Sequence, residues 1–209
     1  IITGRDKRIT AYHEAGHAVA AYFLPECERV HQVTTIQRGQ AAGLTVCRPE
    51  TDDNYVTKGK MYQDIVMTMG GRVAEAITFD DVCTGASGDI QQATKRARAM
   101  VTHYGFSEKL GPVLYGGDDN GGVFLGRDYG HTPQYSEETL NLIDSEIKSI
   151  ITKAYDECTA LLTEHKDKLT EVAEYLIENE KISGDDFDKL MKGELDWRKT
   201  EEKTVSEAP

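Results

Sequence analysis

Two histidines and a glutamate near the start of the chain form the motif HEAGH at residues 13–17. If this segment is helical, His13 and His17 lie on one face, because side chains four positions apart on a helix are neighbours. Two imidazoles at that spacing can bind one Zn²⁺, and Glu14 can take a proton from a zinc-activated water and pass it to a leaving amine. The motif therefore predicts a zinc-dependent peptide hydrolase with Glu14 as its general base.

The competing interpretation is a pair of ordinary helix histidines, with Glu14 in solvent. The apolar residues that follow the motif, AVAA at 18–21, argue against it because they indicate a buried helix. Two imidazoles without partners would be costly on such a helix. The zinc interpretation is therefore preferred.

A third zinc ligand must come from elsewhere, since no G-x-x-H follows the motif. The candidates are two carboxylates, Glu75 and Asp89, and two histidines, His31 and His103. Asp89 falls at the start of an expected helix, where a carboxylate complements the helix dipole even without a metal. Residue type and spacing favour Asp89 and Glu75 equally and the two histidines less.

Apolar periodicity predicts a mostly α fold, in which a zincin-like helix carries the motif beside a small β-hairpin or sheet and a C-terminal helical bundle follows. Helices are expected at about 10–24, 58–79, 87–104, 136–165, 169–179 and 185–191, and strands at 30–36 and 44–47. Gly70 and Gly71 in the second helix indicate a close contact there. The glycine-rich residues 106–135 are expected to form a long loop, a candidate functional segment.

Composition narrows the class of protein. The chain has 36 acidic and 24 basic residues, a formal net charge of −12, which disfavours nucleic acid and anionic membranes as partners. No apolar run approaches the ~20 residues that span a bilayer, and the charged residues that follow the N-terminus predict no signal peptide. No G-x-x-x-x-G-K-[ST] phosphate loop occurs either. Four scattered cysteines without a C-x-x-C pair indicate free thiols in a reducing compartment: Cys27, Cys47, Cys83 and Cys158.

Five segments in one order carry a family resemblance across about residues 8–192. They are TAYHEAGHA (10–18), GGRVAE (70–75), TGASGDI (84–90), GFSEKLGP (105–112) and VFLGR (123–127). Together they resemble the protease domain of the FtsH family of membrane-bound, ATP-dependent zinc metalloproteases.

The resemblance implies specific roles at the metal site. It implies one Zn²⁺ per chain with Asp89 as the third ligand beside the two motif histidines. Glu75 would then orient a ligand histidine from behind. Ala76 stands where an acidic residue often follows in the family, which weakens any role for a pair of carboxylates at that place.

The resemblance also implies a longer protein. Residues 1–9 would be a linker from a missing AAA+ ATPase domain, which would bind ATP and Mg²⁺ and follow a transmembrane segment. Residues 10–197 would form the metalloprotease domain, with a zinc-site part at about 10–135 and a helical part at about 136–197. The polar composition of residues 198–209 separately predicts a disordered tail. The assembly would be a homo-hexamer at the cytoplasmic face of a bacterial inner membrane, or alternatively an organellar membrane. It would degrade unfolded membrane and cytosolic proteins in quality control, while this fragment would be soluble.

An edge strand at Leu44, Thr45 and Val46 is expected to bind substrate as an added strand, since main-chain hydrogen bonds suit a protease of broad specificity. The alternative is an interior strand, paired on both sides. Two rival functions remain beside the FtsH-type protease: a stand-alone zincin, and a catalytically silent hexamerisation domain. The intact His13, Glu14 and His17 argue against the silent domain, and the five matching segments argue against the stand-alone enzyme.

Overall fold

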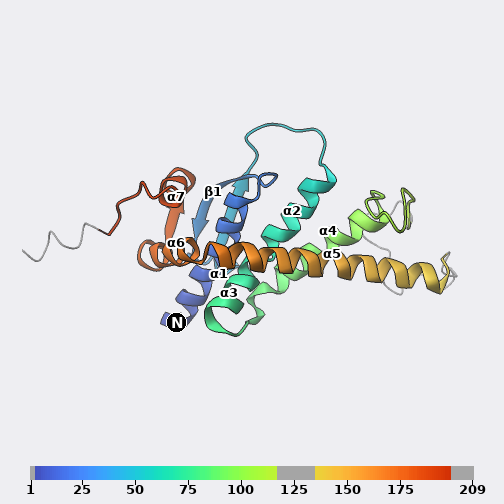
Figure 1. Ribbon diagram of the computed structural model, residues 1–209. Helices are drawn as coiled ribbons and strands as arrows, with labels where there is room; N and C mark the ends of the chain where they lie inside the picture. The colour runs from blue at the N-terminus through green and yellow to red at the C-terminus, as the bar shows by residue number, and fades with distance from the viewer. Residues whose placement is uncertain (1–2, 117–134, 199–209) are drawn as a thin grey trace, which may run out of the picture.

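The computed structural model describes residues 3–116 and 135–198 of the chain. Helices dominate these residues, and three short strands form one small sheet (Figure 1). The helices are α1 (Gly4–Phe23), α2 (Lys58–Thr68), α3 (Gly70–Phe79), the short 3₁₀ helix η1 (Thr84–Ala86), α4 (Ser87–Thr102), α5 (Glu137–Glu164), α6 (Lys166–Asn179) and α7 (Gly184–Met191). The strands are β1 (Arg29–Thr34), β2 (Leu44–Arg48) and β3 (Lys181–Ser183). The predicted mostly α fold with a small sheet is confirmed.

Helix α1 carries the HEAGH motif and runs through the middle of the fold. It begins with a capping box, in which the Thr3 hydroxyl accepts a hydrogen bond from the Asp6 backbone N–H and the Asp6 carboxylate accepts one from the Thr3 backbone N–H. Between residues 11 and 21 almost every position is buried, and most of the side chains are small. This lets α3 and α6 pack closely on α1, so the motif is held inside the protein.

The contact between α1 and α3 runs through two glycines. A Cβ added to Gly16 would lie 2.2 Å from the carbonyl oxygen of Gly70, and one added to Gly70 would lie 2.6 Å from the carbonyl oxygen of Gly16. No side chain fits at either position, so only glycine permits the two backbones to approach this closely. The close contact predicted at Gly70 therefore exists, and its partner is the motif helix.

The single helix predicted over residues 58–79 is wrong in one respect. The chain forms two helices, because α2 ends at Thr68 and α3 begins at Gly70, with Met69 as the cap residue shared by both. The break coincides with the glycine pair. Glycine disfavours helical backbone, and at Gly70 the backbone of α1 lies in close contact with the chain.

The sheet has the order β2-β1-β3, with both pairings antiparallel. In the register of β1 and β2, Val33 pairs with Thr45 and Thr34 with Leu44. Within the described residues β2 has a partner on one side only, so it is an edge strand. Strand β3 comes from the C-terminal part and pairs with β1, so the two predicted parts of the domain share one sheet.

Several predicted boundaries need correction. Helix α1 begins at Gly4 rather than at Thr10, so residues 4–9 of the predicted linker belong to this helix. Strand β3 was not predicted, because three residues are too few to show a period. Most of the predicted 106–135 loop (residues 117–134) and almost all of the predicted tail (residues 199–209) lie outside the described residues.

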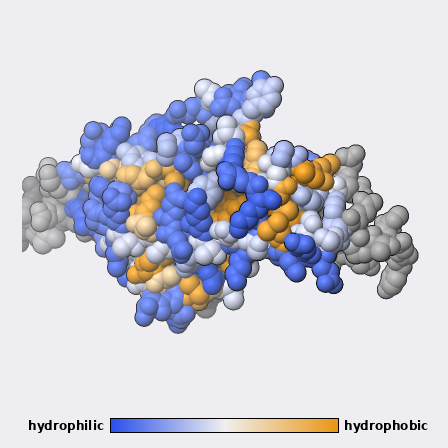
Figure 2. All heavy atoms as spheres, turned by 45° about the vertical axis from the view of Figure 1, so that its right-hand side comes forward, coloured by the Kyte–Doolittle hydropathy of each residue, from blue (hydrophilic) through white to orange (hydrophobic). Residues whose placement is uncertain are grey.

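The visible surface is largely hydrophilic (Figure 2). Figure 2 shows one face on which hydrophilic residues predominate and hydrophobic residues emerge in separate patches. Among the described helices, none combines the length and the apolar character that crossing a membrane would require.

Candidate metal centre and active site

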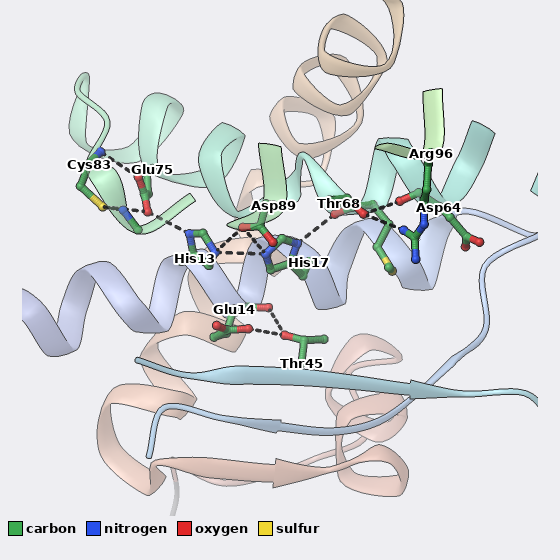
Figure 3. A network of polar contacts seen from close by, with 12 residues as sticks. His13, Glu14, His17, Thr45, Asp64, Thr68, Glu75, Cys83, Asp89 and Arg96 are labelled. Carbon is green, nitrogen blue, oxygen red and sulfur yellow. Dashed lines mark hydrogen bonds and ion pairs between the residues drawn. The ribbon is translucent and has the colours of Figure 1, made fainter. Parts of the chain in front are cut away.

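Helix α1 directs the two motif histidines to the same point (Figure 3). The Nε2 atoms of His13 and His17 lie 3.1 Å apart. Asp89, in the first turn of α4, brings its Oδ2 to 3.0 Å from Nε2 of His13 and to 3.4 Å from Nε2 of His17. Potential ligand atoms of the three residues lie within 4.8 Å of one another. Two nitrogens and one carboxylate oxygen thus converge from segments that are more than 70 positions apart.

The charges of this cluster depend on one another. Burial acts to raise the pKa of Asp89, but hydrogen bonds with His13 and His17 outweigh it and hold the pKa of this carboxyl well below its usual range. Burial acts to lower the pKa of His13, but hydrogen bonds with Asp89 and Glu75 outweigh it and raise that pKa to about 10. The negative charge that favours a proton here also favours a divalent cation.

Glu75 lies behind His13 rather than beside the three converging atoms. Its Oε1 is 2.9 Å from Nδ1 of His13, the ring nitrogen that faces away from Asp89. The backbone N–H of Cys83 donates to Oε2 of Glu75 at 3.1 Å, and the Cys83 thiol donates to Oε1 at 3.3 Å. Burial acts to raise the pKa of Glu75, but these hydrogen bonds outweigh it and lower the pKa. Glu75 is therefore held as a carboxylate that accepts from His13.

Gly71 makes room for the His13 ring. A Cβ added there would lie 2.4 Å from both Cε1 and Nε2 of the imidazole. The two neighbouring glycines of α3 thus serve different neighbours, because Gly70 meets the backbone of α1 and Gly71 meets a histidine side chain.

His17 is oriented by the main chain. Its Nδ1 lies 2.9 Å from the carbonyl oxygen of Met67, in the last turn of α2. In an unbroken helix that carbonyl would accept from the N–H of Gly71. The regular helix is interrupted two residues later, at Met69, whose N–H also reaches the Met67 carbonyl oxygen. A carbonyl oxygen has two lone pairs, so it can accept from His17 as well.

The pairing of both rings suits zinc. A carbonyl oxygen can only accept, so Nδ1 of His17 must carry the hydrogen, and Nε2 of the neutral ring keeps its lone pair for a cation. The carboxylate of Glu75 imposes the same tautomer on His13. Zinc-binding histidines characteristically donate the other ring N–H to a carboxylate or a backbone carbonyl. His13, His17 and Asp89 thus fit three protein ligands of a zinc site that keeps a further position open.

The two histidines considered as alternative ligands lie elsewhere. His31 is in β1, and His103 follows the C-terminus of α4. Neither belongs to the one metal-ligand group found among the described residues.

Glu14 lies on the sheet side of α1, opposite Thr45 of β2 (Figure 3). The Thr45 hydroxyl is 2.7 Å from Oε2 of Glu14 and 3.1 Å from the Glu14 carbonyl oxygen. The start of β2 approaches this side chain so closely that a Cβ on Gly43 would lie 2.8 Å from Cγ of Glu14. Glu14 is 7% exposed, and its charge is among those that raise the pKa of His13. A carboxylate that acts electrostatically on His13 is thus held between α1 and the start of β2.

A cleft of about 950 Å³ connects these features. Its walls come from α1, the segment that enters β2, the end of α2 and the start of α4. The candidate metal ligands, Glu14 and Thr45 all line it. The three converging atoms, the carboxylate of Glu14 and the start of the edge strand thus border one cavity.

Residues 1–190 match peptidase family M41. The chain belongs to this family. It is 51% identical over 194 residues to "ATP-dependent zinc metalloprotease FtsH 1" of Thermoanaerobacter sp. (strain X514), covering 93% of this chain and 32% of the relative. It is 48% identical over 191 residues to "ATP-dependent zinc metalloprotease FtsH" of Caldicellulosiruptor bescii, covering 91% and 31%.

A third M41 relative, "ATP-dependent zinc metalloprotease FtsH" of Veillonella parvula, is 45% identical over 192 residues, covering 92% of this chain and 30% of the relative. The chain thus spans about a third of the length of the curated relatives it matches. These matches confirm the resemblance to the protease domain of the FtsH family.

Some residues of this M41 site were not found by reasoning from the sequence. The Met67 carbonyl and the Cys83 thiol carry no sequence signal, since any residue has a carbonyl and a lone cysteine predicts nothing. The prediction for Thr45 concerned its main-chain atoms and did not include the contact of its hydroxyl with Glu14. Gly70 and Gly71 did predict a close contact from the sequence, but not that the contact is with α1 and the His13 ring.

Proposed function

We propose that this domain hydrolyses peptide bonds in extended, unstructured protein segments, with one zinc ion held by His13, His17 and Asp89. The observation that carries the proposal is the convergence of the three donor atoms. In addition, Nδ1 of each histidine already has a hydrogen-bond partner, which is Glu75 for His13 and the Met67 carbonyl for His17. When bound, zinc would polarise the scissile carbonyl and make a water molecule nucleophilic near neutral pH.

Glu14 acts as the general base in this proposal. Its carboxylate accepts the proton of the attacking water and returns it to the amine as the peptide bond breaks. Its position beside the motif histidines and its low exposure support the role. Glu75 has a different task, which is to keep His13 in one orientation and one tautomer.

The outer edge of β2 binds substrate in this proposal. Residues Leu44, Thr45 and Val46 border the cleft or continue from it, and within the described residues no strand covers that edge. A peptide added there would pair through its main chain, so recognition would depend little on its side chains. This suits an enzyme that degrades many different unfolded proteins.

In this proposal a longer protein supplies the ATP-driven unfolding and the membrane attachment. Relatives named ATP-dependent FtsH proteases extend well beyond the matched part. We therefore propose an AAA+ domain that uses ATP and Mg²⁺, a membrane anchor and a homo-hexamer as the setting of this domain. Quality control of unfolded membrane and cytosolic proteins, at the cytoplasmic face of a bacterial inner membrane, is the proposed role.

A paired digest tests the domain's activity. The zinc-loaded chain is incubated with casein and, separately, with a stable fluorescent protein that carries an unstructured tail. Casein and the tail should be cut while fluorescence persists, because opening a folded domain costs about 5–15 kcal/mol. The 209 residues contain no phosphate-loop motif with which to use ATP for that work.

Glu14→Gln is the matched variant, since the amide keeps size and shape but cannot accept the proton. It should retain zinc and lose activity by at least about 100-fold. Activity within tenfold of the parent would remove Glu14 from the role of base. Absence of zinc-dependent cleavage by the parent chain would overturn the proposed protease function.

A further inference from the structure

We infer that Thr45 is a positioning residue that holds the carboxylate of Glu14 in the orientation needed for proton transfer. The inference rests on the proposed function, since it assigns a partner to the proposed general base. Its starting observation is the 2.7 Å contact between the Thr45 hydroxyl and Oε2 of Glu14.

The hydroxyl has one hydrogen and two acceptors within reach. The carboxylate oxygen is at 2.7 Å and the Glu14 carbonyl oxygen at 3.1 Å. A hydrogen bond to a charged oxygen is shorter and stronger than one to a neutral oxygen, so the hydrogen points to the carboxylate. Thr45 therefore donates to the side chain of Glu14.

This bond gives the two carboxylate oxygens of Glu14 different roles, because only Oε2 accepts from Thr45. Among the described residues, no other hydrogen bond reaches the carboxylate of Glu14, and Oε1 stays free to accept a proton. A glutamate side chain has three rotatable bonds and loses considerable freedom when it is fixed. One bond to Oε2, together with the contact of Gly43 against Cγ, restricts that freedom before substrate arrives.

The strand fixes Thr45 in turn. Thr45 pairs with Val33 in the sheet, and its β-branched side chain has few χ1 rotamers. Because side chains alternate along a strand, Thr45 points toward α1, as Figure 3 shows, while Leu44 and Val46 project from the opposite face. The hydroxyl is thus placed by backbone pairing rather than by a mobile loop.

The position of Thr45 connects two parts of the proposed site. Its main chain belongs to the edge proposed for substrate, and its side chain holds the proposed base. A peptide that pairs with β2 would further restrain the residue that orients Glu14. Loss of the hydroxyl should therefore slow the chemical step more than it weakens substrate binding.

The test uses the whole 209-residue chain with an unstructured fluorogenic peptide, measuring kcat, KM and bound zinc. Thr45→Val keeps the shape and the β propensity but removes the hydroxyl, and it should lower kcat by about 10- to 100-fold, the effect of one hydrogen bond to a charged group. KM and zinc content should stay within about twofold of the parent. Thr45→Ser keeps a hydroxyl and should recover kcat to within about threefold.

Two controls complete the design. Thr35→Val removes a hydroxyl directly after β1 that contacts the Glu180 carbonyl oxygen, and it should leave kcat unchanged. Adding Thr45→Val to Glu14→Gln should lower kcat no further, because the base that Thr45 orients is already gone.

A kcat for Thr45→Val within twofold of the parent, a loss confined to KM, or a Ser variant as slow as the Val variant would each overturn the inference. Full activity of Glu14→Gln would instead overturn the proposed base, so the two failures are distinguishable.

Discussion

Replacing Gly71 by alanine tests how tightly α3 shapes the metal centre. The added Cβ would lie 2.4 Å from Cε1 and Nε2 of His13, whereas ordinary contacts between such atoms are about 3.5–4.0 Å. The ring or α3 must therefore move by about 1 Å. A shift of that size lengthens the bonds of His13 to Glu75 and Asp89, now 2.9 and 3.0 Å, beyond hydrogen-bond range.

The expected result is a zinc affinity about 10- to 100-fold weaker, which corresponds to about 1.4–2.7 kcal/mol. Competition with a chromophoric chelator measures this directly, and circular dichroism of the zinc-free chain checks that the variant folds. Gly59→Ala is the matched control, because the nearest atom to a Cβ there is Thr57 Oγ1 at 3.9 Å. It should leave zinc affinity unchanged and raise helix stability by at most about 1 kcal/mol. Binding by Gly71→Ala within threefold of the parent would refute the steric reasoning.

Two further predictions concern the metal ligands and the thiols. Asp89→Ala should weaken zinc binding more than Glu75→Gln, because the first variant removes a ligand atom and the second only weakens the hydrogen bond that orients His13. A zinc titration in which Glu75→Gln binds more weakly than Asp89→Ala would contradict the assignment of Asp89 as the third ligand. Burial raises the pKa of Cys47 to about 11 and that of Cys27 to about 12, so at pH 8 maleimide should label both at least about tenfold more slowly in the folded chain than in urea. The labelling rate in the folded chain should rise with pH as more thiolate forms, and equal rates in the two states, followed by peptide mass spectrometry, would count against the buried environment.

Local spacing was enough to identify part of the site from the sequence. The HEAGH motif placed His13 and His17 on one face of a helix, and the structure brings their Nε2 atoms within 3.1 Å. The choice between Asp89 and Glu75 was not accessible to the same reasoning. Both are acidic residues on helices, and their distances to His13 depend on how α1, α3 and α4 pack. The family resemblance favoured Asp89, and the structure brings Asp89 and Glu75 to different nitrogens of one ring.

The errors at element boundaries also have physical causes. The charged residues 5–8 were interpreted as linker, although such residues suit the exposed first turns of a helix and Thr3 with Asp6 forms a capping box. The pairing of Lys181–Ser183 with β1 depends on contacts more than 140 positions apart in the chain. Only tertiary structure reveals it.

The partners of the two histidines differ in how they respond to mutation. Glu75 is a side chain, so a single codon change can weaken or remove the support of His13. The support of His17 is the carbonyl of Met67, which every amino acid at that position would retain. A mutant library built to tune metal affinity can therefore vary the hydrogen bond to His13 by substituting position 75. On the His17 side it must instead alter the junction between α2 and α3.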